Sequence, residues 1–251
     1  MSRNDHWLAF LLVAVLTLIY APTVRFGYIT LDDRFFHIET PQLHGGINAS
    51  TLHWALTDTA GNYWHPTWNL VNLVAFTAFG PHAGPQHVVN TVLYGAMSAG
   101  LFYTLRATTL RAAVAFVAAA LWAWHPLHVE NVNWLTERAG LLAAGFCIAT
   151  VAAYLAYGRR PSAWRYALVA LCLFLAMGAK PIYAALPVAL LALDLWPLDR
   201  EGRVTFDPPT QNRIAAAFGK AATELGLPIR WGGRFHGFKD RDRSHFELVP
   251  R

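Results

Sequence analysis

The sequence predicts a mainly α-helical membrane protein, a polytopic bundle of about five to six spans, with a small α+β fragment at its carboxyl terminus. Of the 251 residues, 55% are hydrophobic and only 14% are charged, and the chain contains ten Trp and nine Tyr. Soluble domains carry more charge, and aromatic residues gather at membrane interfaces. The net charge of +5 does not indicate a nucleic-acid partner, because the basic residues flank apolar runs instead of forming one stripe.

Six apolar segments define the predicted membrane domain, residues 1–203. Several approach the roughly 20 residues that cross a bilayer, and the shorter ones require tilt or partial burial. Arg3 before the first segment is typical of a signal peptide, but no small-residue cleavage site follows, which predicts an uncleaved anchor. The segments are 6–24, 86–105, 112–124, 139–157, 164–179 and 182–198.

The distribution of basic residues predicts the orientation of the bundle. Arginines concentrate in the loops 106–111, 158–165 and 200–203. Cytoplasmic loops carry an excess of Lys and Arg. Both the amino terminus and the segment 204–251 are therefore expected on the cytoplasmic side of an inner, or plasma, membrane. The opposite side then holds only Arg25, Arg34, Arg138 and Lys180.

A long outer loop, residues 25–85, follows the first predicted span. Loops of this length in a compact protein are usually functional. The loop contains the pair Asp32-Asp33, which by itself is typical of a cap on a short helix that starts at Arg34. Its apolar piece 69–79 is too short to span and predicts a helix that lies in the interface or re-enters it.

A second polar stretch, residues 125–140, lies between two apolar segments and carries His125, His128, Glu130, Glu137 and Arg138. Ionisable groups beside hydrocarbon cost on the order of 2.5–3.5 kcal/mol each, so their presence indicates a site. The plainer interpretation is a polar loop at the membrane edge. The two histidines are expected to form a hydrogen-bonded structural pair rather than a metal site.

Charged residues near span ends also have structural interpretations. Glu137 and Arg138 are adjacent and therefore point in different directions on a helix, whereas Glu130 and Arg138 fall on one face. Pairing of Arg138 with either glutamate is compatible with a purely structural role. Arg138 and Lys180 also lie where long basic side chains snorkel to the headgroup layer.

Five motifs in a fixed order, over about residues 7–200, resemble the bacterial branch of the transmembrane and tetratricopeptide-repeat (TMTC) proteins. They are Tyr28 to Arg34, Trp64 to Asn69, His125 to Glu130, Glu137-Arg138, and Ala179 to Pro197. The resemblance implies a GT-C-type glycosyltransferase fold and transfer of a sugar from a polyprenyl-phosphate donor in the membrane lipid to an acceptor on the non-cytoplasmic face. The family continues with more helices and repeats that this sequence lacks, which predicts a truncated bundle and a partner protein that supplies them.

The resemblance also implies roles for the polar residues. An inverting transfer needs a general base for the acceptor hydroxyl and cations or donors for the departing phosphate. Asp33 or Asp32 is expected to be the base, and the other to orient the acceptor or hold a divalent metal ion. The donor phosphate is assigned to His65, His125, His128, Arg138 and Lys180, with support from Glu130 and Glu137.

Residues 204–251 differ sharply in composition and form a second predicted domain. A helix is expected over 211–225, and the turn at Trp231 with the ending His245 to Leu248 resembles the carboxyl-terminal part of phage-type L-alanyl-D-glutamate or D-alanyl-D-alanine peptidases. That resemblance implies that His245 binds zinc and that Asp242 is the base. Catalytic zinc usually has three protein ligands, and the family's upstream ligands are absent here, so peptidase activity is not expected unless the fragment is completed.

The sequence is therefore compatible with three functions. The first is the glycosyltransferase implied by the five motifs, and the second is a non-catalytic membrane module or truncated fusion. The third is a zinc-dependent peptidoglycan peptidase.

Overall fold

The computed structural model describes residues 1–30, 32–59, 64–108, 111–181, 229–231 and 246–248. It divides into two compact units, Met1–Ala184 and Ala185–Arg251. In the second unit, β1 (Ile229–Trp231) pairs antiparallel with β2 (Phe246–Leu248). The predicted span 182–198, the predicted helix 211–225 and the predicted domain boundary after residue 203 lie outside the described residues.

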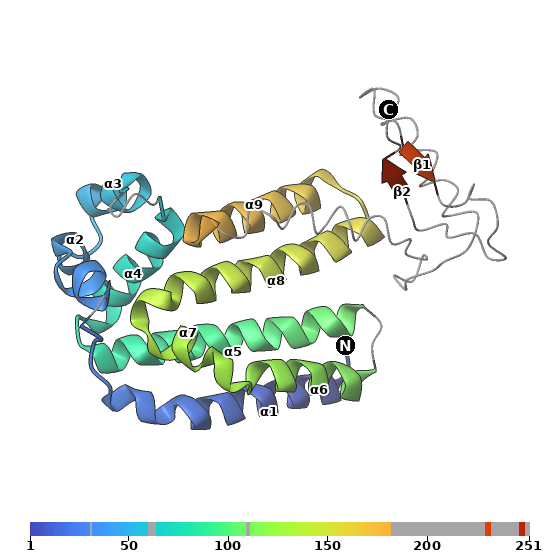
Figure 1. The fold of residues 1–251 in the computed structure, drawn as a ribbon, viewed down its shortest axis with the longest axis horizontal. Helices are drawn as coiled ribbons and strands as arrows, with labels where there is room; N and C mark the ends of the chain where they lie inside the picture. Colours follow the sequence, from blue (N-terminus) through green and yellow to red (C-terminus); the bar gives the residue numbers. More distant parts are fainter. Residues whose placement is uncertain (31, 60–63, 109–110, 182–228, 232–245, 249–251) are drawn as a thin grey trace. The chain divides into compact units, whose positions relative to one another are not determined.

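Long helices build the first unit (Figure 1). They are α1 (Arg3–Tyr20), which continues as the 3-10 turn η1 (Ala21–Arg25), α5 (Ala83–Ala107), α8 (Arg138–Arg159) and α9 (Ala163–Ala179). Helix α5 packs against α1 and α8, and α8 packs against α9. The largest apolar core lies between α1, α5 and α6 (Ala112–Ala123). It includes Leu12, Leu16, Tyr94 and Phe102.

A bent segment joins α5 to α8. Helix α6 (Ala112–Ala123) is followed by the 3-10 turn η4 (Pro126–His128), α7 (Val129–Asn133) and the turn η5 (Leu135–Glu137), with a bend of 52° between α6 and the part that begins at Pro126. Backbone carbonyls freed by such a break need other donors. The Tyr94 hydroxyl donates to the Ala123 carbonyl at 2.7 Å, and Asn90 Nδ2 donates to the Val132 carbonyl at 3.1 Å. Helix α5 therefore holds the bend in place.

The number of membrane spans agrees only in part with the prediction. The described residues contain three helices long and apolar enough to cross a membrane, Arg3–Arg25, Ala83–Ala107 and Leu135–Arg159, or four if the bent pair α6 and α7 is one span. Helix α6 alone has 12 residues, about 18 Å at 1.5 Å per residue, and α9 has 17 residues, about 25 Å. Both are short for a core of about 30 Å. The helices are those of an integral membrane protein.

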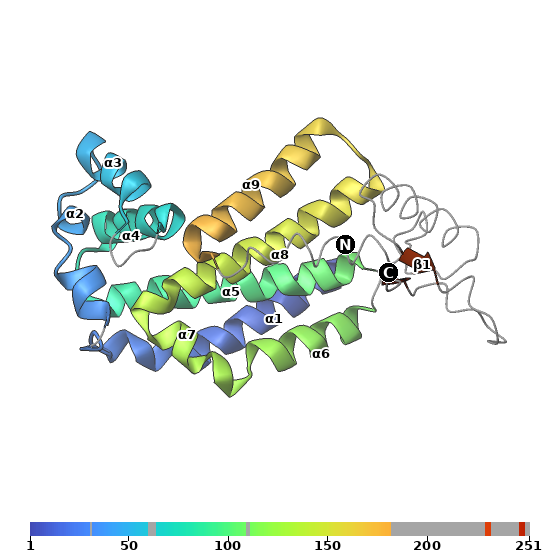
Figure 2. The same cartoon turned by 45° about the horizontal axis from the view of Figure 1, so that its top comes forward.

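The predicted outer loop is mostly helical. It contains the π-helical turn η2 (Arg34–Ile38), α2 (Pro41–His44), α3 (Ala49–Thr57) and α4 (Pro66–Phe79), which we call the cap. Figures 1 and 2 show the cap at one end of the bundle, beside the start of α8 and the end of α9. The helix expected over 69–79 is confirmed, and it begins earlier, where Pro66 fits the first turn because its missing N–H would have no partner there.

The other end of the bundle carries the amino terminus (Figure 1). Ser2 and Asp5 form a capping box at the start of α1. The Asp5 carboxylate is fully buried and accepts from Arg106 Nε at 2.9 Å and from Arg106 Nη2 at 3.2 Å. This ion pair ties the start of α1 to the end of α5.

Candidate functional site

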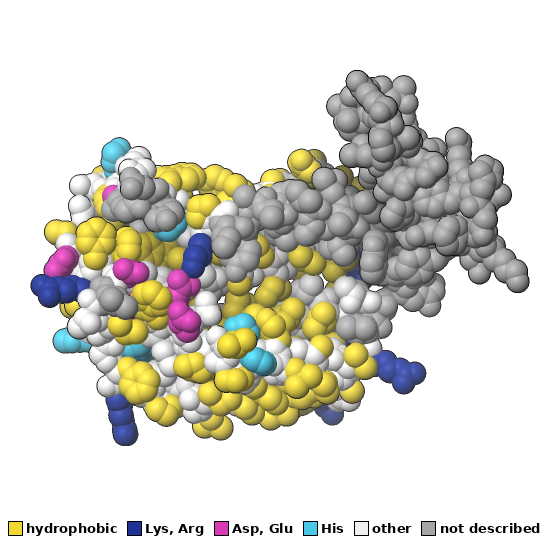
Figure 3. Space-filling view, in the orientation of Figure 1, with side chains coloured by type: hydrophobic (Ala, Val, Ile, Leu, Met, Phe, Trp, Pro, Cys, Tyr) yellow, Lys and Arg dark blue, Asp and Glu magenta, His cyan; other side chains and the backbone are white. Residues whose placement is uncertain are grey.

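Four segments that are far apart in the sequence meet at the cap end of the bundle. They are the turn before η2, the start of α4, the junction of η5 with α8, and the end of α9. The Asp33 carboxylate bonds to Thr136, and Lys180 bonds to Glu137. Gly178 lies so close to α4 that a Cβ there would approach Thr67 Oγ1 to 2.7 Å. Figure 3 shows acidic, basic and histidine side chains gathered toward this end on the face in view.

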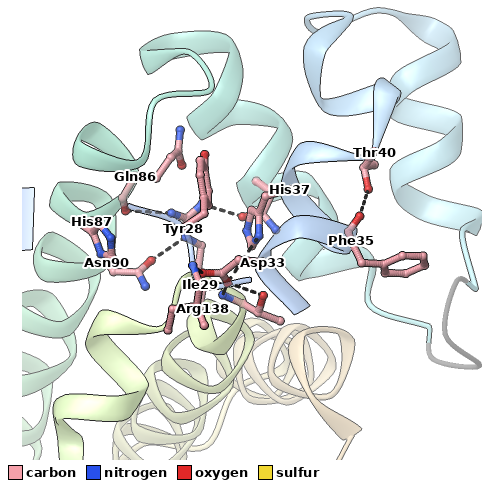
Figure 4. A network of polar contacts seen from close by, with 12 residues as sticks. Tyr28, Ile29, Asp33, Phe35, His37, Thr40, Gln86, His87, Asn90 and Arg138 are labelled. Carbon is pink, nitrogen blue, oxygen red and sulfur yellow. Dashed lines mark hydrogen bonds and ion pairs between the residues drawn. The ribbon is translucent and has the colours of Figure 1, made fainter. Parts of the chain in front are cut away.

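Arg138 lies at the centre of a buried polar network (Figure 4). Its side chain is 0% exposed. Nε donates to Asn90 Oδ1 at 2.7 Å, Nη1 donates to Asn72 Oδ1 at 2.6 Å, and Nη2 donates to the Gln86 carbonyl at 2.9 Å. Three acceptors from α4 and α5 thus enclose a guanidinium at the start of α8. Such an arrangement fixes three helices relative to one another, and it differs from the snorkelling expected of a basic residue at a span end.

Asp33 is a second buried member of this network. One carboxylate oxygen accepts from both the backbone N–H and the hydroxyl of Thr136, at 2.8 and 2.7 Å, and the other accepts from the Ile29 N–H at 3.0 Å. Asp33 does occupy the N-cap position of the short helix η2 that starts at Arg34, as the capping interpretation expects, but its side chain makes no capping hydrogen bond to that helix. The carboxylate instead ties the turn before η2 to η5, 103 residues later.

We call the residues Asp33, Asn72, Asn90, Thr136 and Arg138 the framework cluster. Asp32, next to Asp33 in the chain, is exposed, so the two carboxylates of the predicted pair differ in what they can reach. A base that receives a proton from an incoming hydroxyl must be accessible to that hydroxyl. Of the two, Asp32 meets this requirement.

His37 lies beside the framework cluster and is fully buried. Its ring stacks on Phe76 at a centroid distance of 5.8 Å, and Nδ1 is 4.0 Å from Asp33 Oδ1. Burial, together with the positive charge of Arg138, lowers the pKa of His37 to about 3. The ring is therefore neutral at physiological pH.

A more accessible group of charges lies beside the framework cluster. Lys180 Nζ donates to both carboxylate oxygens of Glu137, at 3.0 and 2.9 Å, and the two side chains are 36% and 21% exposed. His65 is half-buried, and burial together with the charge of Lys180 lowers the pKa of its ring. We call His65, Glu137 and Lys180, together with the exposed Asp32, the open cluster. Asp32 is included through its place in the chain, because its neighbour Asp33 bonds to Thr136, which precedes Glu137.

The structure corrects two pairings expected from the sequence. Glu137 pairs with Lys180, and Arg138 pairs with neutral amides, so neither Glu130 nor Glu137 is the partner of Arg138. Because Glu137 and Arg138 are adjacent, they do diverge as predicted, one toward α9 and the other into the bundle.

The expected hydrogen-bonded pair of histidines is also wrong. His125 is exposed, and its Nδ1 accepts from the Leu127 N–H at 3.3 Å. His128 packs on the Trp122 ring at 4.5 Å and on Tyr94 at 5.7 Å. Their side chains share no hydrogen bond in the described structure, and only the backbone joins them, where the His128 N–H donates to the His125 carbonyl at 3.1 Å.

A metal site has no support in the described part of the chain. Within the described ranges, no three side chains of His, Cys, Asp or Glu come together in a group that would hold a metal ion. A divalent ion at Asp32 or Asp33 stays a prediction. Asp242 and His245, the expected base and zinc ligand of the carboxyl-terminal fragment, lie outside the described residues.

Sequence reasoning missed four members of the network, Asn72, Gln86, Asn90 and Thr136. The signal was present for two of them: Asn72 and Asn90 are polar residues in largely apolar stretches, where polar groups need partners. Gln86 meets Arg138 through its backbone carbonyl, which any residue would supply. Nothing in the sequence paired them with Arg138 in particular, since their separations from it run from 48 to 66 residues.

Comparisons with known proteins show a distant likeness for the amino-terminal 60% of the chain. Over that part the chain is 29% identical to protein O-mannosyl-transferase TMTC1 of Mus musculus. A shorter stretch of 74 residues, which is 29% of the chain, is 38% identical to the protein of the same name from Homo sapiens. The matched regions cover 17% and 8% of these relatives, well under two thirds of their length. No family model and no solved structure matches the chain. The peptidase resemblance of residues 205–251 gains no support.

Proposed function

We propose that this chain is the membrane part of a GT-C-like glycosyltransferase of a bacterial inner membrane. It would transfer a sugar from a polyprenyl-phosphate donor to an acceptor on the non-cytoplasmic face. The observation that carries the proposal is the meeting of the predicted motifs around Asp32, His65, Glu137 and Lys180 at one end of the bundle. The distant likeness to O-mannosyl-transferases over 60% of the chain supports the same reaction class.

The charges at the two ends support the orientation. Arg106, Arg111, Arg159, Arg160 and Arg165 lie at or beside the ends of α5, α6, α8 and α9 that face away from the cap. Because arginine-rich loops stay in the cytoplasm, the cap and the open cluster would face the non-cytoplasmic side.

In the proposed reaction, Asp32 is the general base. It takes the proton of an acceptor hydroxyl while the hydroxyl oxygen forms a bond to the anomeric carbon of the donor sugar. The bond between that carbon and the phosphate oxygen breaks, and the electron pair leaves with the polyprenyl phosphate. The exposure of Asp32 supports this role over Asp33, whose carboxylate oxygens already accept three hydrogen bonds.

Lys180 is the residue we assign to the donor phosphate. An ammonium group has three N–H donors, and Glu137 accepts from two of them, so among the described residues one N–H is left for a phosphate oxygen. His65 stands within reach of the charge of Lys180. Arg138 is a positioning residue in this proposal because its guanidinium is enclosed. Of the two remaining histidines, only His125 is exposed enough to meet a headgroup.

The experiment is donor binding to the chain purified in detergent, with a polyprenyl-phosphate mannose as the probe. We expect saturable binding that Lys180→Gln weakens about tenfold, because one charge-assisted contact to phosphate is worth about 1.4 kcal/mol or more. Arg25→Gln is the matched control, since Arg25 is an exposed cation outside the site. Equal binding by wild type and Lys180→Gln would contradict the assignment.

The second candidate is a non-catalytic membrane module that works with a partner protein. The pairing of Lys180 with Glu137 favours it, because a satisfied ion pair needs no ligand. The same binding experiment separates the two candidates: folded protein that fails to bind the donor would be a module, and Asp32→Asn would then leave it unchanged in every assay.

A further inference from the structure

The cap contains a cavity of about 210 Å³ that has no role in the reaction proposed above. It opens between η2, α2, the end of α3 and the start of α4. Its lining includes Phe36, Glu39, Trp54, Asp58, Trp68 and Asn69. Drug-sized ligands occupy pockets of about 300–1,000 Å³, so this space suits a smaller molecule, about one sugar ring.

The lining combines two kinds of side chain. Phe36 and Trp68 meet edge to face at a centroid distance of 5.3 Å, and Trp54 adds a third aromatic ring. Asp58, Glu39 and Asn69 add carboxylate and amide groups to the lining. A hexopyranose has an apolar face of C–H groups and a rim of hydroxyls, and it would match rings on one side and acceptors on the other.

The charge of the lining excludes anions. Asp58 makes no ion pair within the described part of the chain, and Glu39 pairs with the exposed Arg34 at 2.7 Å. The Asp58 carboxylate would repel a phosphate, whereas carboxylate oxygens accept hydrogen bonds from neutral hydroxyls. A phosphate would instead meet Lys180, outside this cavity.

We infer that this cavity binds a single neutral hexopyranose, with the ring of Trp54 against its apolar face and Asp58 accepting from its hydroxyls. The inference rests on the proposed function for the source of the sugar, which is either the donor or an acceptor that already carries one. Phe35 and Phe36 line the cavity and follow Asp32 by three and four residues. The cavity therefore adjoins the turn that carries the proposed base.

The test is equilibrium binding of methyl α-D-mannopyranoside to the full chain in detergent, measured by saturation-transfer NMR. We expect binding in the millimolar range. Trp54→Ala and Asp58→Asn should each weaken it at least fivefold, and Gln42→Trp, which fills the cavity from an exposed position, should abolish it. Trp164→Ala removes an exposed tryptophan of α9, outside the cavity, and should leave binding unchanged.

The outcomes separate this inference from the proposed function. Absence of sugar binding by folded wild-type protein, or binding that Gln42→Trp leaves intact, overturns the inference. Sugar binding that depends on the cavity supports it even if a polyprenyl-phosphate mannose never binds, in which case only the proposed function fails. Competition by polyprenyl-phosphate mannose assigns the cavity to the donor sugar, whereas competition only by a mannosylated serine peptide assigns it to the acceptor.

Discussion

The framework cluster and the open cluster lie at the same end of the bundle and differ in how their charges are satisfied. Arg138 is enclosed by three neutral acceptors and has no exposed surface, whereas Lys180 faces one carboxylate and is 36% exposed. Arg138 and Glu137, the carboxylate that pairs with Lys180, are adjacent in the sequence. The position of an ionisable residue at a membrane edge therefore does not tell a structural residue from a site residue, whereas its burial and the number of its partners do.

The largest expected effect breaks the framework cluster. Arg138→Met removes the N–H groups that donate to Asn90 Oδ1, Asn72 Oδ1 and the Gln86 carbonyl, and it leaves these three buried acceptors without a partner. Each unpaired group costs about 1–3 kcal/mol, so the free energy of unfolding should fall by at least about 3 kcal/mol. Thermal unfolding in detergent measures it. Arg25→Met, at an exposed site, should change it by less than about 0.5 kcal/mol, and equal losses in both variants would erase the distinction.

The adjacent carboxylates offer a matched pair of substitutions. Asp33→Asn replaces a carboxylate that accepts from Ile29 and Thr136, and we expect a loss of about 2 kcal/mol in unfolding free energy, because hydrogen bonds to charged groups contribute about 1.5–3 kcal/mol. Asp32→Asn should leave stability unchanged and abolish sugar transfer. An Asp33→Asn variant as stable as wild type would show that the Asp33 carboxylate does not stabilise the framework cluster.

The buried His37 predicts a pH dependence. Its pKa is about 3 in the folded protein and about 6.5 when unfolded, so the unfolded state binds more protons in between. Stability is therefore full above pH 6.5 and falls as the pH is lowered toward 3. Between pH 6.5 and pH 5 we expect a loss of about 1.5 kcal/mol. Denaturation curves of wild type and His37→Phe measure it, and a variant with the same pH slope as wild type would disprove the assignment.

The smallest expected effect tests the close contact between α9 and α4 beside the open cluster. Gly178→Ala would place a Cβ 2.7 Å from Thr67 Oγ1 and 3.2 Å from Pro66 Cγ, which forces α9 away from α4 and should cost about 1 kcal/mol. Gly158→Ala, in α8, meets no atom within 4 Å and should be neutral or slightly stabilising. Donor binding should weaken in the first variant alone, since Lys180 follows the displaced turn.

Sequence reasoning reached the parts of the fold that depend on local pattern. The long apolar runs predicted the helices at Arg3–Arg25, Ala83–Ala107 and Leu135–Arg159 because length and hydropathy act within one segment. The helix of the cap over 69–79 followed from the same signal.

The rest depended on contacts between distant segments. The sequence identified Arg138 as special but not its partners, because side chains 48 to 66 residues away meet it only after α4, α5 and α8 have packed. It also treated Asp32 and Asp33 as equivalent. Their difference arises from Thr136, whose N–H and hydroxyl both bond to Asp33 and to no atom of Asp32 that the structure shows.

The ion pair at the far end of α1 has a consequence for biosynthesis. Asp5 and Arg106 are 101 residues apart, so the ribosome must add the cap and α5 before the fully buried carboxylate meets its cation. Until then, Asp5 stays in contact with water at the membrane surface, because an unpaired carboxylate is expensive to bury. The first helix can therefore enter the membrane early but takes its final place only when α5 has been made, which couples the last step of its assembly to the progress of translation.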